Sequence, residues 1–140
     1  VNLPPSREAE IYFVDVEGEV APLAREVEDR SPQTVIETLL ATETSGLPSE
    51  FSSNVPPDTT LLDSFTEGDV LTVDLSEQFT TIQAERFIAA VAQIVFTAAA
   101  LDEIDAVAFR VEGEDFPVSD EEGAQQEGPV TPNDYAGLLA

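Results

Sequence analysis

The stretch "AVAQIVFTAAALDEIDAVAFRVEGE", residues 90–114, decides the fold. It begins inside a predicted helix and ends as a short predicted strand that turns at Gly113. Running from Thr80 to Leu101, the helix would span roughly 30 Å at 1.5 Å per residue. Burying each large side chain on its apolar face stabilises the fold by about 1.5–3 kcal/mol, so we expect this helix to be the spine of the core. The apolar positions that share this face are Ala84, Phe87, Ile88, Val91, Ile94, Val95 and Ala98.

Four polar residues lie at the start of this helix or within its apolar part. Thr80 is suited to cap its first turn, and Gln83 would complete a capping box three residues later. Gln93 and Thr97 stand four residues apart inside the apolar part. These two side chains can hydrogen-bond to each other, cap a sheet edge in the core, or contact a ligand, and we expect a structural role.

The N-terminal part of the chain predicts a hairpin followed by a shorter helix. Residues 10–16 and 20–27 flank a turn near Gly18, and Pro22 places the second strand at an edge or a bulge. The helix begins with Ser31 as N-cap, has proline at its first position, and presents one apolar face. That face consists of Val35, Ile36, Leu39 and Leu40.

A second hairpin and the order of elements complete the fold prediction. Residues 61–65 and 70–75 flank the turn "TEGD", and the order along the chain is β-β-α-β-β-α-β. We therefore expect an α+β fold, a two-layer sandwich in which two helices pack on one face of a mixed, mostly antiparallel sheet of hairpins. Residues 1–9 are predicted to be a linker and residues 10–140 a single domain. Within that domain we expect residues 119–128 to form a mobile acidic loop, and Tyr135, Leu138 and Leu139 to pack back on the core.

Composition excludes several classes of function. The chain has 29 acidic residues against five arginines and a net charge of −24, which disfavours nucleic acid and anionic membrane surfaces as partners. It has no cysteine and no histidine, which excludes disulfides, thiolate metal sites and histidine-dependent triads within the chain. No apolar run is long enough to span a membrane, although a lipid anchor upstream of Val1 is compatible with the sequence.

Two groups of residues are candidates for ligand contacts. Asp74, Ser76 and Glu77 lie at the end of a predicted strand, where they can bind a ligand or satisfy free backbone amides. Arg25 can clamp a carboxylate or a phosphate, or it can pair across the hairpin with an acid. The acids within reach of Arg25 are Glu10, Glu17 and Glu19. For both groups we expect the structural role.

The many carboxylates leave two further alternatives. A run of acids can gather calcium, although its spacing is not that of an EF-hand, or it can be a solvated charge run. This run consists of Glu112, Glu114, Asp115, Asp120, Glu121 and Glu122. A pair of carboxylates in a cleft could also hydrolyse a wall glycan. We expect neither, and we assign no catalytic residue, no metal ligand and no cofactor.

Six segments form a pattern in chain order: "IYFVDVEGEVAPLAREV", "VIETLLA", "VPPDTTLLDSF", "VLTVDLSEQF", "QIVFTAAALDEIDAVAFRVEGE" and "NDYAGLL". In these segments and in their order, the sequence resembles the GerMN domain, the sporulation and spore germination module of bacterial envelope lipoproteins. The chain departs from the family pattern at Thr42-Glu43, where a Gly-Pro is frequent, in the loop "SGLPSEFSS", and in residues 119–128.

This resemblance implies a non-catalytic, extracytoplasmic module of a cell-envelope protein that is tethered by a lipid. It implies a protein or a cell-wall component as partner, and a role linked to sporulation, germination or cell-wall processes. The family has no established set of catalytic residues to transfer to this chain. A carboxylate-based wall hydrolase and a calcium-dependent structural module remain the alternatives.

Overall fold

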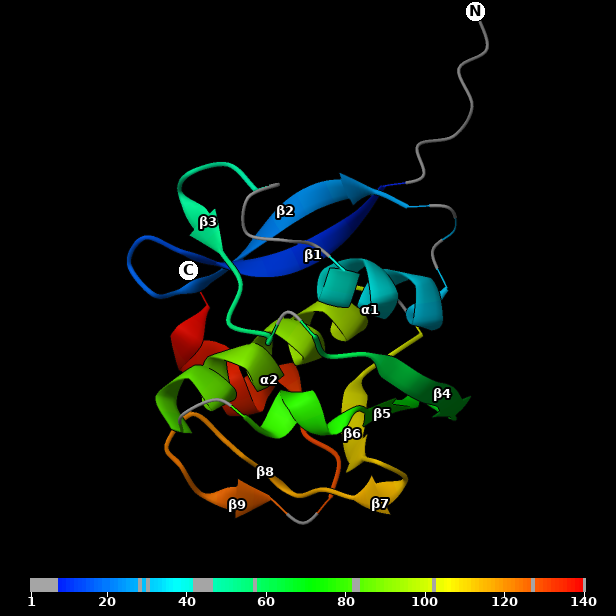
Figure 1. The fold of residues 1–140 in the computed structure, drawn as a ribbon. Coiled ribbons are helices and arrows are strands. Elements are labelled where there is room, and N and C mark those ends of the chain that lie inside the picture. Colours follow the sequence, from blue (N-terminus) through cyan, green and yellow to red (C-terminus); the bar gives the residue numbers. More distant parts are fainter. Residues whose placement is uncertain are drawn as a thin grey trace, which may run out of the picture.

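The computed structural model describes residues 8–27, 29, 31–41, 47–56, 58–81, 84–101, 103–126 and 128–139 (Figure 1). Thr42, Glu43 and Gln83 lie outside these residues. The helices and strands of the described part are β1 Glu8–Asp15, β2 Val20–Glu26, α1 Pro32–Ala41, β3 Phe51–Ser52, β4 Leu61–Glu67, β5 Val70–Leu75, the 3₁₀ helix η2 Glu77–Thr80, α2 Ala84–Ala99, β6 Ala106–Val111, β7 Glu114–Asp115, β8 Val118–Ser119, β9 Gln125–Gln126 and the 3₁₀ helix η3 Pro132–Leu138.

The α+β class is confirmed, and the predicted element order recurs as β1-β2-α1-β4-β5-α2-β6. The described strands divide into three sheets, ordered β2-β1-β3, β4-β5-β6-β7 and β8-β9. All pairs are antiparallel except β5 and β6, which are parallel and are connected through α2. The sheets are thus mixed and mostly antiparallel, as expected.

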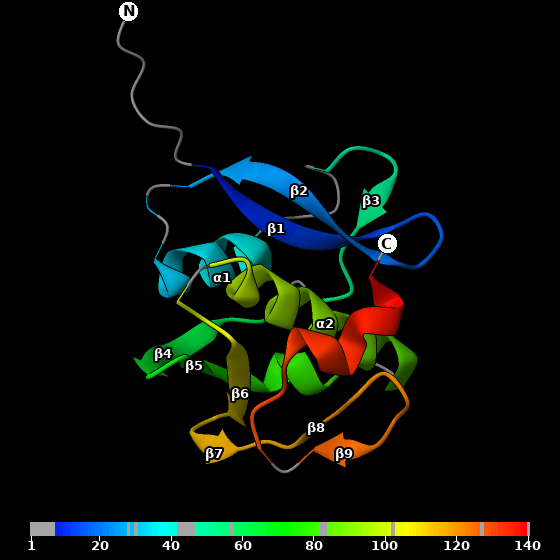
Figure 2. The same ribbon diagram turned by 180° about the vertical axis from the view of Figure 1, so that it is seen from behind.

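The layering differs from the expected single sheet with both helices on one face. Figures 1 and 2 show α1 and α2 lying between the β1–β2 hairpin and the β4–β5–β6 strands. The reason is visible in α2, which is buried on every side from Ala89 to Ala98. Alanines fill much of the surface outside the predicted apolar face, and their small side chains let a second layer approach the helix.

The predicted core of α2 is confirmed, but its predicted start is wrong. Val91 and Ile94 are fully buried. Thr80 does not cap this helix, because it ends the preceding 3₁₀ helix and its hydroxyl donates to the Glu77 carbonyl at 2.7 Å. The helix ends at Ala99, and Leu101 follows in a turn closed on the Ala98 carbonyl.

The local signals of the N-terminal half are confirmed. The Ser31 hydroxyl accepts the Thr34 amide at 3.2 Å, and the four apolar residues predicted on this helix are buried. The first hairpin turns through Gly18, whose φ of 82° suits glycine. The Asp15 carboxylate closes this turn by accepting the amides of Glu17 and Glu19 at 2.9 and 3.0 Å. Pro22 lies in β2, an edge strand of its sheet, as predicted.

The C-terminal part holds more regular structure than the sequence predicts. The stretch 119–128, expected to be a mobile loop, begins at the last residue of β8 and includes β9, which pairs with β8 as a short hairpin. Its turn is closed by the Asp120 carboxylate, which accepts the amides of Glu122 and Ala124. Tyr135 is fully buried as expected, whereas Leu139 is 40 % exposed. The carboxylate of Asp134 caps the second 3₁₀ helix by accepting the Thr131 amide at 2.8 Å.

Candidate functional site

Gln93 and Thr97 of α2 hold the edge of β1, which is one of the roles predicted for them. The Gln93 side-chain amide donates to the Tyr12 carbonyl at 3.1 Å, and the Thr97 hydroxyl accepts the Tyr12 amide at 3.0 Å. Gln93 also accepts the Asn54 amide at 2.8 Å and donates to the Ser53 hydroxyl at 3.1 Å. Two side chains one helical turn apart thus take the place of a neighbouring strand.

This arrangement also explains why a proline is tolerated in β2. The N–H and C=O of a strand residue point to the same side, so both polar groups of Tyr12 face α2 and away from β2. Pro22 lies directly opposite Tyr12 in the hairpin. The position opposite therefore needs no amide donor, and the missing N–H of proline costs no ladder hydrogen bond.

Asp74, Ser76 and Glu77 serve the backbone at the end of β5. The Asp74 carboxylate accepts the Gly113 amide at 3.0 Å, and the Ser76 hydroxyl accepts the Thr60 amide at 2.9 Å. The Glu77 amide donates to the Glu112 carboxylate at 2.9 Å. These contacts tie β5 to the turn after β6 and to the segment before β4. The side chains of Asp74 and Ser76 have the expected structural role, whereas Glu77 contributes its backbone amide.

The expected pairing of Arg25 across the first hairpin is wrong. Arg25 lies opposite Ala9 in the register, which places it on the other face of the sheet from Glu10. Within the described residues the only ion pair joins Arg110 Nε to Asp115 Oδ1 at 3.4 Å. The Arg110 guanidinium also lies 5.2 Å from the centroid of the Phe65 ring.

The acidic residues proposed as calcium ligands are divided between two turns. Glu112 receives the Glu77 amide and Asp115 pairs with Arg110, both near the end of β6. Asp120 is used by the β8–β9 turn, where its second oxygen accepts the Gln126 side-chain amide at 3.1 Å. In the described part of the chain, no three Asp or Glu side chains gather in a way that could hold a metal ion.

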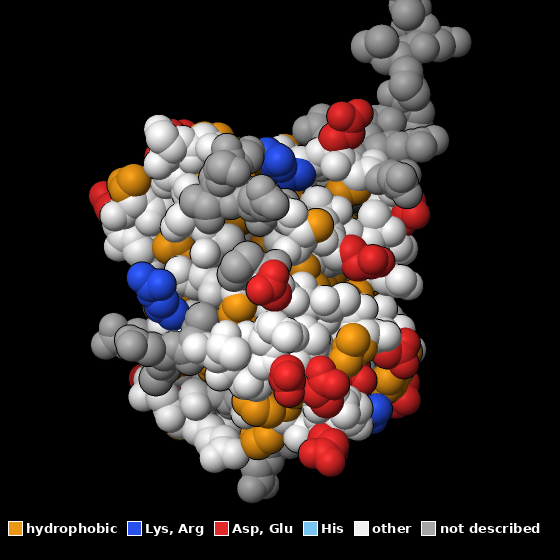
Figure 3. Space-filling view, in the orientation of Figure 1, with side chains coloured by type: hydrophobic (Ala, Val, Ile, Leu, Met, Phe, Trp, Pro, Cys, Tyr) orange, Lys and Arg blue, Asp and Glu red, His pale blue; other side chains and the backbone are white. Residues whose placement is uncertain are grey.

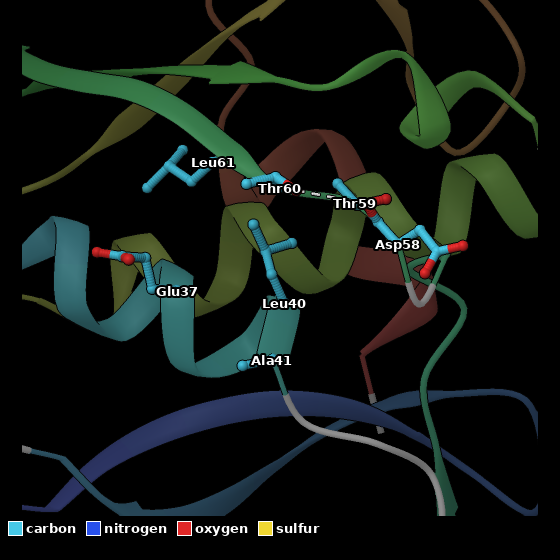
Figure 4. Close-up of a pocket in the computed structure, with 7 residues that line it drawn as sticks. All are labelled: Glu37, Leu40, Ala41, Asp58, Thr59, Thr60 and Leu61. Atoms are coloured by element: carbon cyan, nitrogen blue, oxygen red, sulfur yellow. Dashed lines mark hydrogen bonds between the residues drawn. The ribbon is translucent and has the colours of Figure 1, made fainter.

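A groove between α1 and the segment that leads into β4 is a candidate site that the sequence did not predict. It has a volume of about 430 Å³ and is lined by Glu37, Leu40, Ala41, Asp58, Thr59, Thr60 and Leu61. Figure 4 shows Leu40 extending from α1 toward Thr59 and Thr60, with Glu37 and Asp58 near opposite ends. No local motif marks this groove, because its two walls come from segments that are separated in the sequence.

Thr59 is the distinctive residue of this groove. It is only 5 % exposed, and its hydroxyl is the one buried side-chain polar atom of the described residues that has no hydrogen-bond partner. A buried hydroxyl without a partner lowers stability, because it has lost water and gained nothing in return. An unpaired polar group of this kind is a contact that a ligand can satisfy.

Charge is spread over the surface around the groove. Figure 3 shows acidic side chains scattered over one face, while the cationic side chains stand apart from one another. The three described arginines lie on β2, α2 and β6, and none of them lines the groove. Glu37 and Asp58 are both exposed and form no ion pair within the described part of the chain.

Tyr135 gives a pH-dependent prediction. Burial, followed by the charges of Asp134 and Asp120, raises the pKa of its phenol well above the ordinary 10.0. The phenol donates to the Ser119 carbonyl at 2.6 Å. Above about pH 10 the unfolded chain releases this proton while the folded chain keeps it, so stability falls by up to about 1.4 kcal/mol for each further pH unit.

Urea unfolding at pH 9 and pH 11 measures this loss. Tyr135→Phe should be less stable than the parent at pH 9, because it loses the hydrogen bond, and should lose less stability on going to pH 11. Tyr12→Phe is the matched control. It should keep the decrease in unfolding free energy between pH 9 and pH 11 that Tyr135 causes. Its pKa is also raised, by burial first and by Glu10 second. An equal pH slope in Tyr135→Phe and the parent would contradict the assignment.

Residues 10–116 match the model of the Germane family, described as sporulation and spore germination. The chain belongs to the Germane family. The matched residues run from β1 to the segment after β7, so they include both helices and both walls of the groove. No curated protein matches this Germane chain.

Solved structures share the fold of this Germane domain. The first GerMN domain of the sporulation protein GerM from Bacillus subtilis superimposes with a TM-score of 0.74 at 21 % identity, over 90 % of this chain and 98 % of that one. The tandem GerMN domains of the same protein give a TM-score of 0.76 at 21 % identity over 91 % of this chain. The present chain spans 46 % of that tandem, about half its length.

A more distant structure comes from Clostridium perfringens and is described as a candidate lipoprotein. It superimposes with a TM-score of 0.60 at 14 % identity, over 100 % of this Germane chain and 98 % of that one. In the described part of the Germane chain, no helix combines the length and the apolar character that crossing a bilayer requires.

Proposed function

We propose that this Germane domain is a non-catalytic binding module of a cell-envelope protein, held outside the cytoplasm by a lipid anchor. Its partner is a protein or a cell-wall component, and its role is linked to sporulation, germination or wall processes. The relation to a sporulation protein and to a candidate lipoprotein supports this context. The proposal rests on one observation, the groove with the unpaired Thr59 hydroxyl.

The polar side chains outside the groove also support a binding role for the groove. Asp74, Ser76, Gln93 and Thr97 each accept a backbone amide, so these side chains maintain the scaffold. The groove differs from them because it combines exposed apolar surface, exposed charge and a polar atom with no partner. A surface of that composition is suited to recognise a ligand by contact.

Co-sedimentation with purified peptidoglycan and capture from an envelope-protein extract test the proposal, alongside assays for released sugars and peptides. We expect binding without product release. Ala41→Trp fills the groove from an exposed position and should weaken binding, whereas Ala136→Trp places the same ring at an exposed site on η3 and should not. An acidic protein of similar net charge controls for non-specific association. Product release, or equal binding by both tryptophan variants, would contradict the proposal.

A further inference from the structure

We propose that the α1–β4 groove binds an extended basic peptide segment, in which an apolar residue stands between two basic residues. This inference rests on the proposed function and names the chemistry of its partner.

The shape and apolar lining of the groove suit a short extended segment. Leu40, Ala41 and Leu61 supply apolar surface between the charged ends. Figure 4 shows the side chain of Leu40 in the middle of the groove, between the positions of Glu37 and Asp58. A volume of about 430 Å³ is within the range of sites that hold small ligands. The central residue of the ligand is therefore apolar.

The charges at the two ends select a cationic ligand. Glu37 and Asp58 are exposed, and within the described residues neither carboxylate is neutralised by an arginine. The net charge of −24 adds a long-range field that attracts cations and repels acidic partners. In an extended peptide, basic residues two positions before and two positions after the apolar one share its face and would place a positive charge near each carboxylate.

The unpaired hydroxyl of Thr59 favours a ligand with hydrogen-bonding groups. Thr59 is one of the residues that line the groove, and its buried hydroxyl has no hydrogen-bond partner. A peptide brings backbone N–H and C=O groups at regular intervals, and either kind can pair with a hydroxyl. Pairing would remove a cost that the free protein bears, so it would contribute to affinity.

The groove leads into a strand edge that pairs with no other strand of the described residues. β4 is an edge strand of its sheet, and its Ser64 amide is accepted by the Asp63 carboxylate at 2.9 Å instead of by another strand. A peptide seated beside Leu61 can continue along this edge as an added strand. A second copy of the chain is a poorer occupant, because Asp63 and Glu67 on β4 would face like charges across the new edge.

Titration of the full chain with two synthetic peptides tests the inference. The probes are acetyl-Lys-Gly-Val-Gly-Lys-amide and the same peptide with glutamate in place of lysine, at fixed ionic strength. We expect the lysine peptide to bind and the glutamate peptide not to bind. Glu37→Gln with Asp58→Asn should weaken binding about tenfold, as expected for the loss of two surface ion pairs. Glu103→Gln with Glu114→Gln removes two exposed acids elsewhere and should leave the affinity within twofold.

Thr59→Val removes the hydroxyl but keeps the shape of the site, so it measures the contribution of the hydroxyl alone. This nearly isosteric change should raise the melting temperature of the free chain and still weaken peptide binding, a combination that general destabilisation cannot produce. Equal weakening by the two double variants would show attraction to overall charge and would overturn the inference. Dimerisation that is strengthened by Glu37→Gln with Asp58→Asn would also overturn it, in favour of a second copy.

The outcomes of the two sets of assays are distinguishable. If no peptide binds but Ala41→Trp still blocks capture of wall or protein, this inference fails and the proposed function stands. If the lysine peptide binds in the groove and no envelope component is captured, the ligand chemistry stands and the proposed function fails. If neither assay shows binding, both fail.

Discussion

Gln93→Leu is expected to lower the free energy of unfolding by about 3–5 kcal/mol, because it leaves several buried polar groups without partners. The side chain of Gln93 is fully buried and makes three hydrogen bonds. Leucine has nearly the same size and would fill the space, so the loss would come from hydrogen bonding and not from a cavity.

The backbone groups that this change would strand explain the size of the effect. The Asn54 amide and the Tyr12 carbonyl both face the core and both depend on Gln93. Each buried group that loses its only partner costs about 1–3 kcal/mol. The Ser53 hydroxyl is less costly, because it also accepts the Val55 amide at 3.3 Å.

Urea denaturation at neutral pH measures the effect through the midpoint and the slope. Gln33→Leu is the matched control, because Gln33 is exposed on α1, and it should change stability by less than about 0.5 kcal/mol. Thr97→Val should cost about 1–3 kcal/mol, because it strands only the Tyr12 amide. If Gln93→Leu were as stable as the parent, another donor would have to reach Tyr12, and α2 would not act as the neighbour of β1.

The parts of the fold that could be predicted from the sequence are those with local causes. Ser31 and Pro32 mark the start of α1 because capping and a fixed φ act within one turn. The turns at Gly18 and Gly68 need a positive φ, which glycine adopts readily, so both hairpins could be located. The helical spacing of apolar residues in α2 is also a local signal, and it identified Val91 and Ile94 as core residues.

The parts that could not be predicted depend on contacts between distant segments. Arg25 pairs with none of the three predicted acids because the register of β1 and β2 sets its face, and alternation within one strand does not reveal that register. The strands cover α2 from two sides because its alanines allow a second sheet to approach. The burial of these alanines depends on that distant sheet and not on their sequence neighbours. The α1–β4 groove is lined by two separate segments, within 37–41 and 58–61, and Thr59 has no neighbour in the sequence that marks its hydroxyl as unpaired.

Phe79 is the clearest residue whose importance the sequence did not reveal. It lies in "SEQFT", directly before Thr80, where the sequence predicts the start of the long helix. In the structure it belongs to the 3₁₀ helix η2 and is fully buried. Its ring centroid lies 5.1 Å from that of Phe87 on α2 and 6.2 Å from that of Phe109 on β6. A short helix thus brings together the two halves of the β5-α2-β6 unit.

Phe79→Ala is therefore expected to lower the free energy of unfolding by about 3–5 kcal/mol, the usual cost of removing a buried aromatic ring and leaving a cavity. Phe79→Leu keeps most of the volume and should lose clearly less. Phe65→Ala removes the same ring from a partly exposed position, where its recorded ring partner is the Arg110 guanidinium, and should cost about 1 kcal/mol. Urea unfolding followed by circular dichroism measures all three. Removal of the Phe79 ring should leave a cavity between α2 and β6, and this cavity is the reason for its larger cost. Equal losses for Phe79→Ala and Phe65→Ala would therefore mean that η2 does not pack on α2.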